Sequence, residues 1–117
     1  MKLLRKVLNK FRFAFAGLIN GLCNDSSIQI QYCLGIITII AAILLKLSII
    51  EWSIILILIG LVIAIEYLNS CIEDLVDLHF SALDPLAKKI KDMSAASVLV
   101  ISIVALVVGG IIFISKL

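Results

Sequence analysis

The chain has 117 residues, enough for one small domain, and it is 63% hydrophobic with only 15% charged residues. This composition is far too apolar for a soluble domain of that size and predicts an integral membrane protein. The net charge of +2 is uninformative as a total, and nothing in the sequence indicates a nucleic-acid partner. The three cysteines lack metal-ligand spacing, so we interpret them as small residues packed within the membrane region.

The first segment, residues 3–22, combines basic and apolar residues, with the apolar positions at helical spacing. It predicts an amphipathic helix in the membrane surface, and a flexible basic tail is the alternative. Charges at Lys10 and Arg12 interrupt any early apolar core, so we expect the segment to be retained rather than cleaved as a signal peptide. The polar residues 24–27 then break the pattern, and Asp25 or a neighbouring serine is a plausible N-cap for the next helix.

Three apolar stretches follow, at about 28–46, 52–78 and 94–115, and each is long enough to cross a hydrocarbon core, which takes about 20 residues. Trp52 suits a membrane interface. Pro85 is placed to begin a short helix before the last crossing. The sequence therefore predicts one all-α membrane domain with three transmembrane helices and a surface helix at its N-terminus.

The basic residues predict the orientation of this domain. Three crossings place the N-terminus and the 79–92 loop on one side, with eight basic residues, against Lys46 and Lys116 on the other. By the positive-inside rule the N-terminus and this loop are cytoplasmic. We therefore expect a multi-pass protein of the cell membrane whose second crossing ends at the cytoplasmic surface.

That end of the second crossing carries the most informative pattern in the chain. Glu66, Asn69, Ser70, Glu73 and Asp77 recur at i, i+3, i+4, i+7 and i+11, and therefore share one helical face. Carboxylates at membrane depth are costly and indicate a functional site. They can bind magnesium and accept a proton from a hydroxyl, which suits phosphoryl transfer to an alcohol. The alternative is that these residues form only the solvated end of a helix, without a functional site.

Two blocks of the sequence carry a resemblance to a known family: Glu66-x-x-Asn69-Ser70-x-Ile72-Glu73-x-x-x-Asp77 and Lys91-Asp92-Met93-Ser94-Ala95-Ala96-Ser97-Val98. They are similar to the motifs of the small prokaryotic diacylglycerol kinase and undecaprenol kinase family. The chain looks most like the Gram-positive branch, in which undecaprenol is the usual substrate. The resemblance implies a homotrimer with active sites at subunit interfaces near the cytoplasmic surface.

The resemblance also implies a role for individual residues. Glu66 matches the glutamate that activates the lipid hydroxyl, and Glu73 matches a magnesium ligand that bridges the ATP phosphates. Asp25 aligns with a second acidic ligand position, where the family usually has glutamate. The remaining nucleotide contacts would be Asn69, Asp77, Lys91, Asp92 and Arg12, although Arg12 could equally reach a lipid headgroup. The lipid substrate would contact Glu66, Asn69, Ser70 and Ser94.

The chain departs from the family pattern at four positions. Gln29 stands where the family commonly has arginine, and Gln31 where it has histidine or glutamate. Cys71 replaces an alanine, and Asp84 stands where a histidine is frequent. The two glutamines put the nucleotide contacts from the first crossing in doubt.

These features together predict an ATP- and magnesium-dependent lipid kinase that phosphorylates undecaprenol in the bilayer. Diacylglycerol is the alternative acceptor within the same chemistry, because the phosphate-handling residues cannot distinguish the two lipids. Two other classes stay open: a small proton- or cation-transport subunit that uses the carboxylates as a path, and a non-enzymatic membrane partner.

Overall fold

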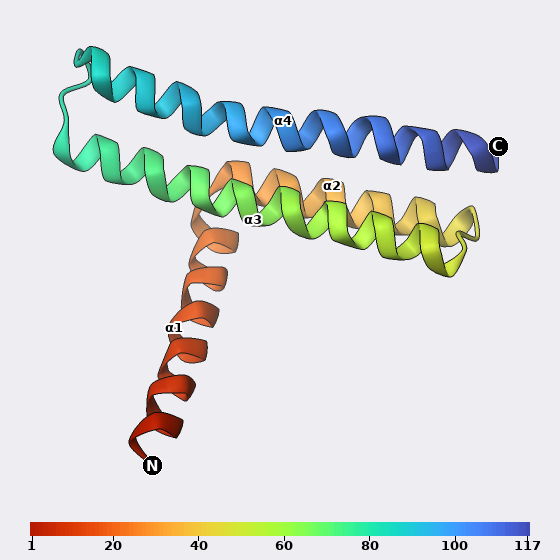
Figure 1. Cartoon of the computed structure of the whole chain (residues 1–117), viewed down its shortest axis with the longest axis horizontal. Helices are drawn as coiled ribbons and strands as arrows, with labels where there is room; N and C mark the ends of the chain where they lie inside the picture. Colours follow the sequence, from red (N-terminus) through yellow and green to blue (C-terminus); the bar gives the residue numbers. More distant parts are fainter.

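The computed structural model describes all 117 residues and contains four α-helices. They are α1 (Lys2–Asn24), α2 (Ser26–Leu44), α3 (Ile49–His79) and α4 (Pro85–Lys116). Figure 1 shows α2, α3 and α4 running alongside one another, while α1 leaves the bundle crosswise from the start of α2. The predicted all-α class, with three apolar helices after a basic amphipathic one, is confirmed.

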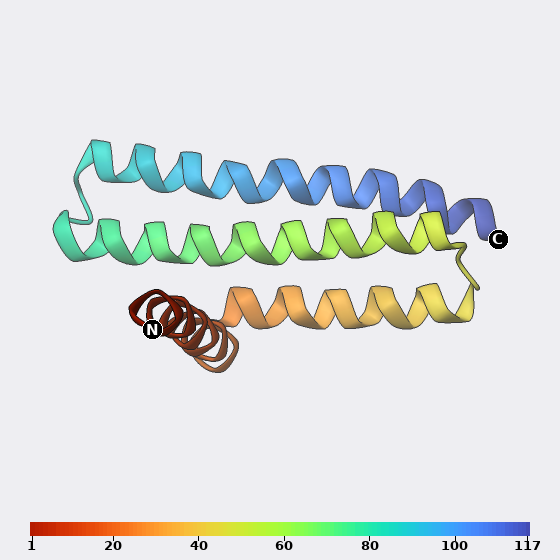
Figure 2. The ribbon, with the colours of Figure 1, turned by 60° about the horizontal axis from the view of Figure 1, so that its bottom comes forward.

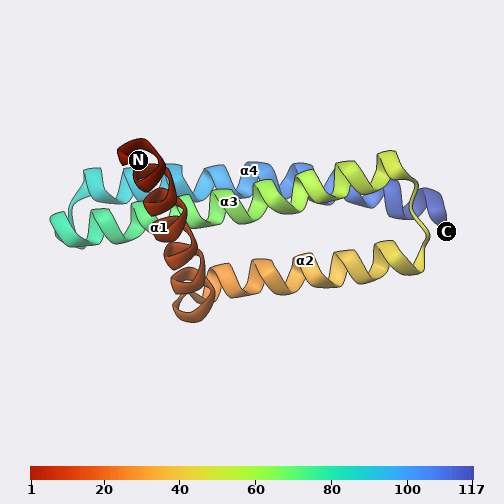
Figure 3. The ribbon, with the colours of Figure 1, turned by 90° about the horizontal axis from the view of Figure 1, so that it is seen from below.

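The helix α3 is the centre of the bundle. Figure 2 shows it between α2 and α4, and α4 packs along it more extensively than α2 does. The view from below in Figure 3 shows α1 running across the long axis of α3 and joining α2 at its first turn. Side chains on different faces of α3 can therefore meet different helices.

All three long helices can cross a membrane by length and composition. With 31 residues, α3 is about 46 Å long, longer than a hydrocarbon core of about 30 Å. Part of α3 must therefore project beyond the core. Only 13 of 117 residues are buried, so most apolar side chains face outward, as expected of a protein surrounded by lipid or by other copies.

The end of the bundle where α2 passes to α3 is fixed by local interactions. The chain leaves α2 through Lys46 in the left-handed region (φ 54°), and the N–H of Leu47 donates to the carbonyl of Ala42. Ser48 and Glu51 then form a capping box at the start of α3. Glu51 also forms an ion pair with Lys116 at 2.8 Å, which joins the end of α4 to the start of α3; we call this end of the bundle the Lys116 corner.

The segment that follows Pro85 differs from the expected short helix. It is the first part of α4, which continues without interruption to Lys116. Asp84 caps this helix by accepting from the backbone N–H groups of Leu86 and Ala87 at 2.8 and 3.4 Å. Proline is favourable in the first turn, and no second proline follows, so nothing separates the loop end of α4 from its membrane part.

Candidate active site

A row of polar side chains follows α3 at the end opposite to the Lys116 corner. Glu66 and Asn69 are buried, with 5% and 8% of their surface exposed, Glu73 is half-buried and Asp77 is exposed. The row extends from Glu66 to Asp77, eleven steps along the helix, or about 16 Å. It therefore leads from the apolar part of the bundle to the solvent end of α3.

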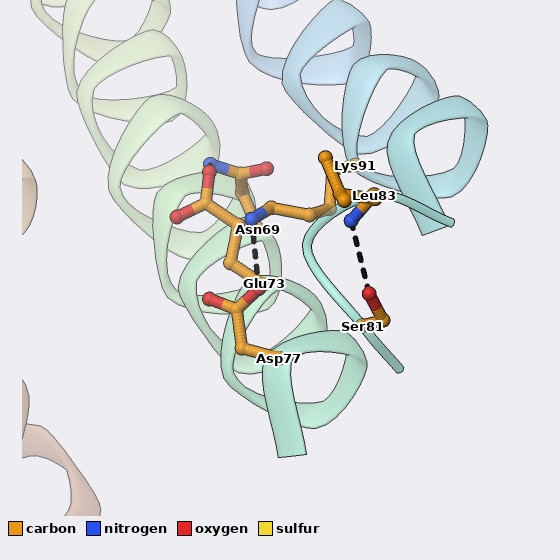
Figure 4. A network of polar contacts seen from close by, with 6 residues as sticks. All are labelled: Asn69, Glu73, Asp77, Ser81, Leu83 and Lys91. Atoms are coloured by element: carbon orange, nitrogen blue, oxygen red, sulfur yellow. Dashed lines mark hydrogen bonds and ion pairs between the residues drawn. The ribbon is translucent and has the colours of Figure 1, made fainter. Parts of the chain in front are cut away.

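The helix α4 fixes one side of this row. The hydroxyl of Ser94 donates to Asn69 Oδ1 at 2.8 Å, and Asn69 Nδ2 donates to Glu73 Oε1 at 3.3 Å. One turn away, Lys91 Nζ donates to Asp77 Oδ1 at 2.8 Å (Figure 4). These bonds orient the Asn69 amide, hold one oxygen of Glu73 beside it and hold Asp77 toward α4. The structure thus brings together five of the residues predicted for the site.

The structure divides the predicted single face into two sides. Asn69 faces α4, but Ser70, also buried, faces α1 and the start of α2. A cavity of about 390 Å³ lies there, and its lining includes Asp25, Tyr67, Ser70 and Asp74. Neighbouring residues on a helix point about 100° apart, so one row of i, i+3 and i+4 positions is wide enough to contact two different partners. Ser70 is therefore separated from the Asn69–Asp77 side.

Glu66 lies between these two sides. Asp25 on one side and Glu73 on the other are both close enough to act on its charge, and the Gln31 and Asn69 amides are also neighbours of its carboxylate. Three acidic groups are therefore electrostatically connected around one buried position. Such a cluster attracts cations, and Lys91 is the only lysine or arginine paired with a carboxylate of the row.

Asp25 is held at the elbow between α1 and α2. It is the N-cap of α2 and accepts from the backbone N–H of Ile28 at 3.1 Å. The Ser70 hydroxyl lowers the pKa of Asp25 below its ordinary value; desolvation opposes this, and the N–H groups of Ile28 and Ser27 lower the pKa further. The carboxylate is thus stabilised in its ionised form where the elbow meets α3.

This environment predicts an acid-dependent loss of stability. A carboxylate with a lowered pKa stabilises the fold above the unfolded pKa of about 3.9, and this contribution disappears as the pH falls through the folded pKa. Asp25→Asn keeps an N-cap but cannot ionise. We expect the wild type to unfold a few degrees above Asp25→Asn at pH 6, and this difference to shrink steadily as the pH falls below about 4, in thermal unfolding in detergent micelles. A difference that stayed constant over this range would contradict the assignment.

Two predicted nucleotide contacts lie apart from the row. Asp92 forms an ion pair with Lys88 on α4 and contacts no side chain of α3 by hydrogen bond. Arg12 is exposed on α1, thirteen residues before Asp25, or about 20 Å along the helix, and it forms no ion pair. Within one chain, therefore, neither residue joins Asn69, Glu73 and Asp77.

Three polar residues near the site have roles that the sequence did not reveal. Gln29 donates to the carbonyls of Leu22 and Cys23 at 2.9 and 3.3 Å, so it caps the end of α1. Tyr32 and Tyr67 meet through their hydroxyls between α2 and α3. They are the only tyrosines in the chain. Since a tyrosine hydroxyl that is removed from water usually has a partner, the presence of two tyrosines in predicted membrane helices was a signal available in the sequence.

The acidic residues of the site suit a magnesium ion that is bound partly by phosphate better than an ion enclosed by protein ligands alone. No group of three acidic, histidine or cysteine side chains in the chain could hold a metal ion. Magnesium, however, is commonly bound by one or two carboxylates together with substrate phosphates and water. Glu73 and Asp25, on either side of Glu66, are carboxylates of the kind that this arrangement needs.

Comparison with known proteins places the chain beside lipid kinases. The family model for prokaryotic diacylglycerol kinase matches residues 12–113. An undecaprenol kinase of Bacillus subtilis is 36% identical over 117 residues, which cover 97% of this chain and 95% of that protein. A diacylglycerol kinase of Synechocystis sp. is 35% identical over 105 residues, covering 89% of this chain and 60% of that protein. The matched region includes the whole polar row.

Proposed function

The chain belongs to the prokaryotic diacylglycerol kinase family and is a membrane lipid kinase, and from this premise we propose that it transfers the γ-phosphoryl group of ATP to the hydroxyl of undecaprenol. The proposal is supported by the polar row on α3, whose side chains change from buried to exposed along the helix. The row places a buried carboxylate at one end, where a lipid hydroxyl can reach it, and charged groups at the other end, where a nucleotide can enter. The similarity to the undecaprenol kinase, over nearly the full length of both chains, supports this choice of acceptor.

Glu66 is the proposed general base. Its carboxylate is the most deeply buried acidic group of the row and lies beside the apolar part of α3. A lipid alcohol keeps its chain in the membrane and presents its hydroxyl at this depth. Removing the hydroxyl proton during attack makes the oxygen a better nucleophile. Asn69, fixed by Ser94, can orient the hydroxyl or a phosphate oxygen next to Glu66.

Glu73 and Asp25 are the proposed magnesium ligands, and the ion would also contact the ATP phosphates. When bound, magnesium neutralises charge on the phosphoryl group as it is transferred. The hydrogen bond from Asn69 holds one oxygen of Glu73, which leaves the other oxygen free for a ligand. Asp25 is kept ionised at the elbow, as a metal ligand must be.

Lys91 is the proposed phosphate contact. Its ammonium group is positioned by Asp77 at 2.8 Å and is partly exposed. A lysine acts on phosphate as a compact point charge with three donors and requires no bidentate geometry. Asp77 thus holds Lys91 in place until a phosphate oxygen shares it, and Asp77 itself is available to a nucleotide at the exposed end of α3.

We propose that the functional unit is a homotrimer whose cytoplasmic side contains α1, the 80–84 loop and the polar row. Arg12 and Asp92 do not reach the row within one chain, so a neighbouring copy is needed if they contact the nucleotide. A groove of about 430 Å³ is lined by α2, α3 and α4, and its lining includes small residues on α2 and α4: Gly35, Thr38, Ser102, Ala105, Gly109 and Gly110. Small residues permit close helix packing in membranes, so a helix of a second copy fits this groove.

Phosphoryl transfer from labelled ATP by purified protein in micelles tests the proposed function directly. Undecaprenol and diacylglycerol are offered separately, with and without magnesium. We expect product from undecaprenol at a rate at least about tenfold above that from diacylglycerol, a preference worth about 1.4 kcal/mol of transition-state binding, and no product without magnesium. Faster transfer to diacylglycerol would reverse the choice of acceptor, and turnover without magnesium would remove the metal from the proposal.

A further inference from the structure

The two tyrosines join three helices at one point. The ring of Tyr32 on α2 meets that of Tyr67 on α3 edge to face, with centroids 6.4 Å apart and an interplanar angle of 87°. Their hydroxyl oxygens are 3.0 Å apart, and Tyr67 also donates to the carbonyl of Leu18 on α1 at 2.7 Å. A phenol has one hydrogen, so Tyr67 uses its own on Leu18, and Tyr32 is the donor to Tyr67.

The bond to Leu18 is the one hydrogen bond that joins α1 to α3. No residue of α1 is buried, so little packing opposes a change in its direction. The other polar contacts that hold α1 lie at the elbow itself, where Gln29 caps the end of α1 and Asp25 caps the start of α2. The orientation of α1 relative to α3 therefore depends on a small number of polar contacts, and the contact made by Tyr67 lies farthest from the elbow.

The backbone of α1 is adapted to the Tyr67 ring. A Cβ added at Gly21 would overlap Tyr67 Cε1, lie 2.9 Å from Tyr67 Cζ and lie 3.0 Å from Ile28 Cδ1, so the ring would have to move. A Cβ added at Gly17, one turn earlier on the same helix, would meet nothing within 4 Å. Gly21 thus permits the close approach that lets the Tyr67 hydroxyl pass α1 and reach Leu18.

Tyr67 follows Glu66 directly and points to the side of α3 away from the Lys91 contacts. The cavity on this side lies between α1 and α3, with Tyr67, Ser70 and Asp25 among its lining residues. A lipid alcohol enters from the membrane, along a helix that lies in the membrane surface. If it reaches Glu66 past α1, the distance between α1 and α3 determines whether its hydroxyl fits.

We propose that Tyr67, supported by Tyr32, is a positioning residue for the lipid acceptor: its hydroxyl fixes the surface helix α1 against α3 on the side of Glu66 opposite to the Lys91–Asp77 contact. This inference rests on the proposed lipid kinase function. Tyr67 takes no part in the transfer. It sets the position of α1 beside the general base, and Tyr32 keeps the Tyr67 hydroxyl turned toward Leu18.

Two measurements on Tyr67→Phe test the proposal, both with the full-length protein in micelles. Hydrogen exchange needs no substrate, and amides of residues 18–25 are expected to exchange about tenfold faster, the factor that corresponds to one lost hydrogen bond. Steady-state kinetics should show KM for the lipid raised several-fold and KM for ATP unchanged. Tyr32→Phe, which leaves the bond to Leu18 intact, should give smaller changes in the same direction.

A matched glycine pair gives an independent test. Gly21→Ala should reproduce the effects of Tyr67→Phe, while Gly17→Ala, the same change on the same helix, should behave as the wild type. In a Tyr67→Leu background the effect of Gly21→Ala should become much smaller, since no ring remains to collide with the new methyl group and only the 3.0 Å approach to Ile28 Cδ1 is left.

Unchanged exchange at residues 18–25 in Tyr67→Phe would overturn the proposal, as would a rise in KM for ATP without a change in KM for the lipid. These results are distinguishable from a failure of the proposed function. If the wild type phosphorylates neither lipid, the lipid kinase assignment fails in the activity assay alone. The exchange measurement would then still decide whether Tyr67 holds α1.

Discussion

The Glu66→Gln variant is expected to transfer phosphate about a thousandfold more slowly than the wild type, because a positioned general base contributes about 10²–10⁴-fold to a rate. Glutamine preserves the size of the side chain and can keep hydrogen bonds to its neighbours at this buried position, but it cannot accept the hydroxyl proton. The fold and the binding of ATP should be unaffected. Single-turnover transfer to lipid and equilibrium binding of ATP, measured on the same preparation, separate these effects.

Glu51→Gln is the matched control for this prediction. Glu51 is a half-buried glutamate of the same helix, but it lies in the first turn of α3 and pairs with Lys116. Its replacement removes one ion pair at the protein surface, which contributes about 0–1 kcal/mol to stability. Activity should stay close to that of the wild type. If Glu66→Gln retained more than about a tenth of the wild-type rate, a loss smaller than any expected for a general base, the role of Glu66 would be lost.

Periodicity predicted the helices of this protein well, because each apolar run is long and each break is strongly polar. It also placed Glu66, Asn69, Glu73 and Asp77 together, since residues three and four apart share a face wherever a helix forms. The partners Lys91 and Ser94 came from the family resemblance. Their side chains meet the row because α4 returns along α3, an arrangement that short loops between long helices favour.

The position of α1 could not be predicted in the same way. Whether Arg12 reaches the row depends on the direction in which α1 leaves the elbow, and no periodic pattern encodes that direction. The contacts present at and near the elbow are the caps made by Asp25 and Gln29 and the hydrogen bond from Tyr67 to Leu18, which link residues far apart in the sequence. The separation of Ser70 from Asn69 could not be predicted for the same reason: Ser70 faces the elbow, whose location depends on contacts between distant residues.

The arrangement around α3 gives the proposed site two sides, which are formed by different parts of the chain. The helix α4 holds Asn69 and Asp77 on one side, and the elbow holds Asp25 on the other, with Glu66 between them. A proposed phosphate donor and a proposed lipid acceptor can thus approach the same carboxylate from different sides. Substitutions of Tyr67 and of Lys91 should then affect different kinetic constants, whereas the proposed metal ligands Asp25 and Glu73, which both lie near Glu66, should both affect the magnesium dependence.

The Glu73→Gln variant is accordingly expected to require about ten- to a hundredfold more magnesium for half-maximal activity, the range seen when the surroundings of a metal site are altered. The glutamine oxygen can still accept the hydrogen bond from Asn69, so the geometry of the row should persist. What is lost is the negative charge that attracts a hard cation. The checking experiment is a magnesium titration of phosphoryl transfer at saturating ATP and lipid.

Asp74→Asn separates a direct ligand from general electrostatics. Asp74 is the next residue of α3 and carries the same charge, but it is exposed and faces the cavity beside α1. Both variants remove one negative charge from the same helical turn. If Glu73 contacts the ion directly, only Glu73→Gln shifts the titration strongly. Equal shifts in both variants would mean that the turn attracts magnesium only through its net charge, and Glu73 would lose its assignment as a ligand.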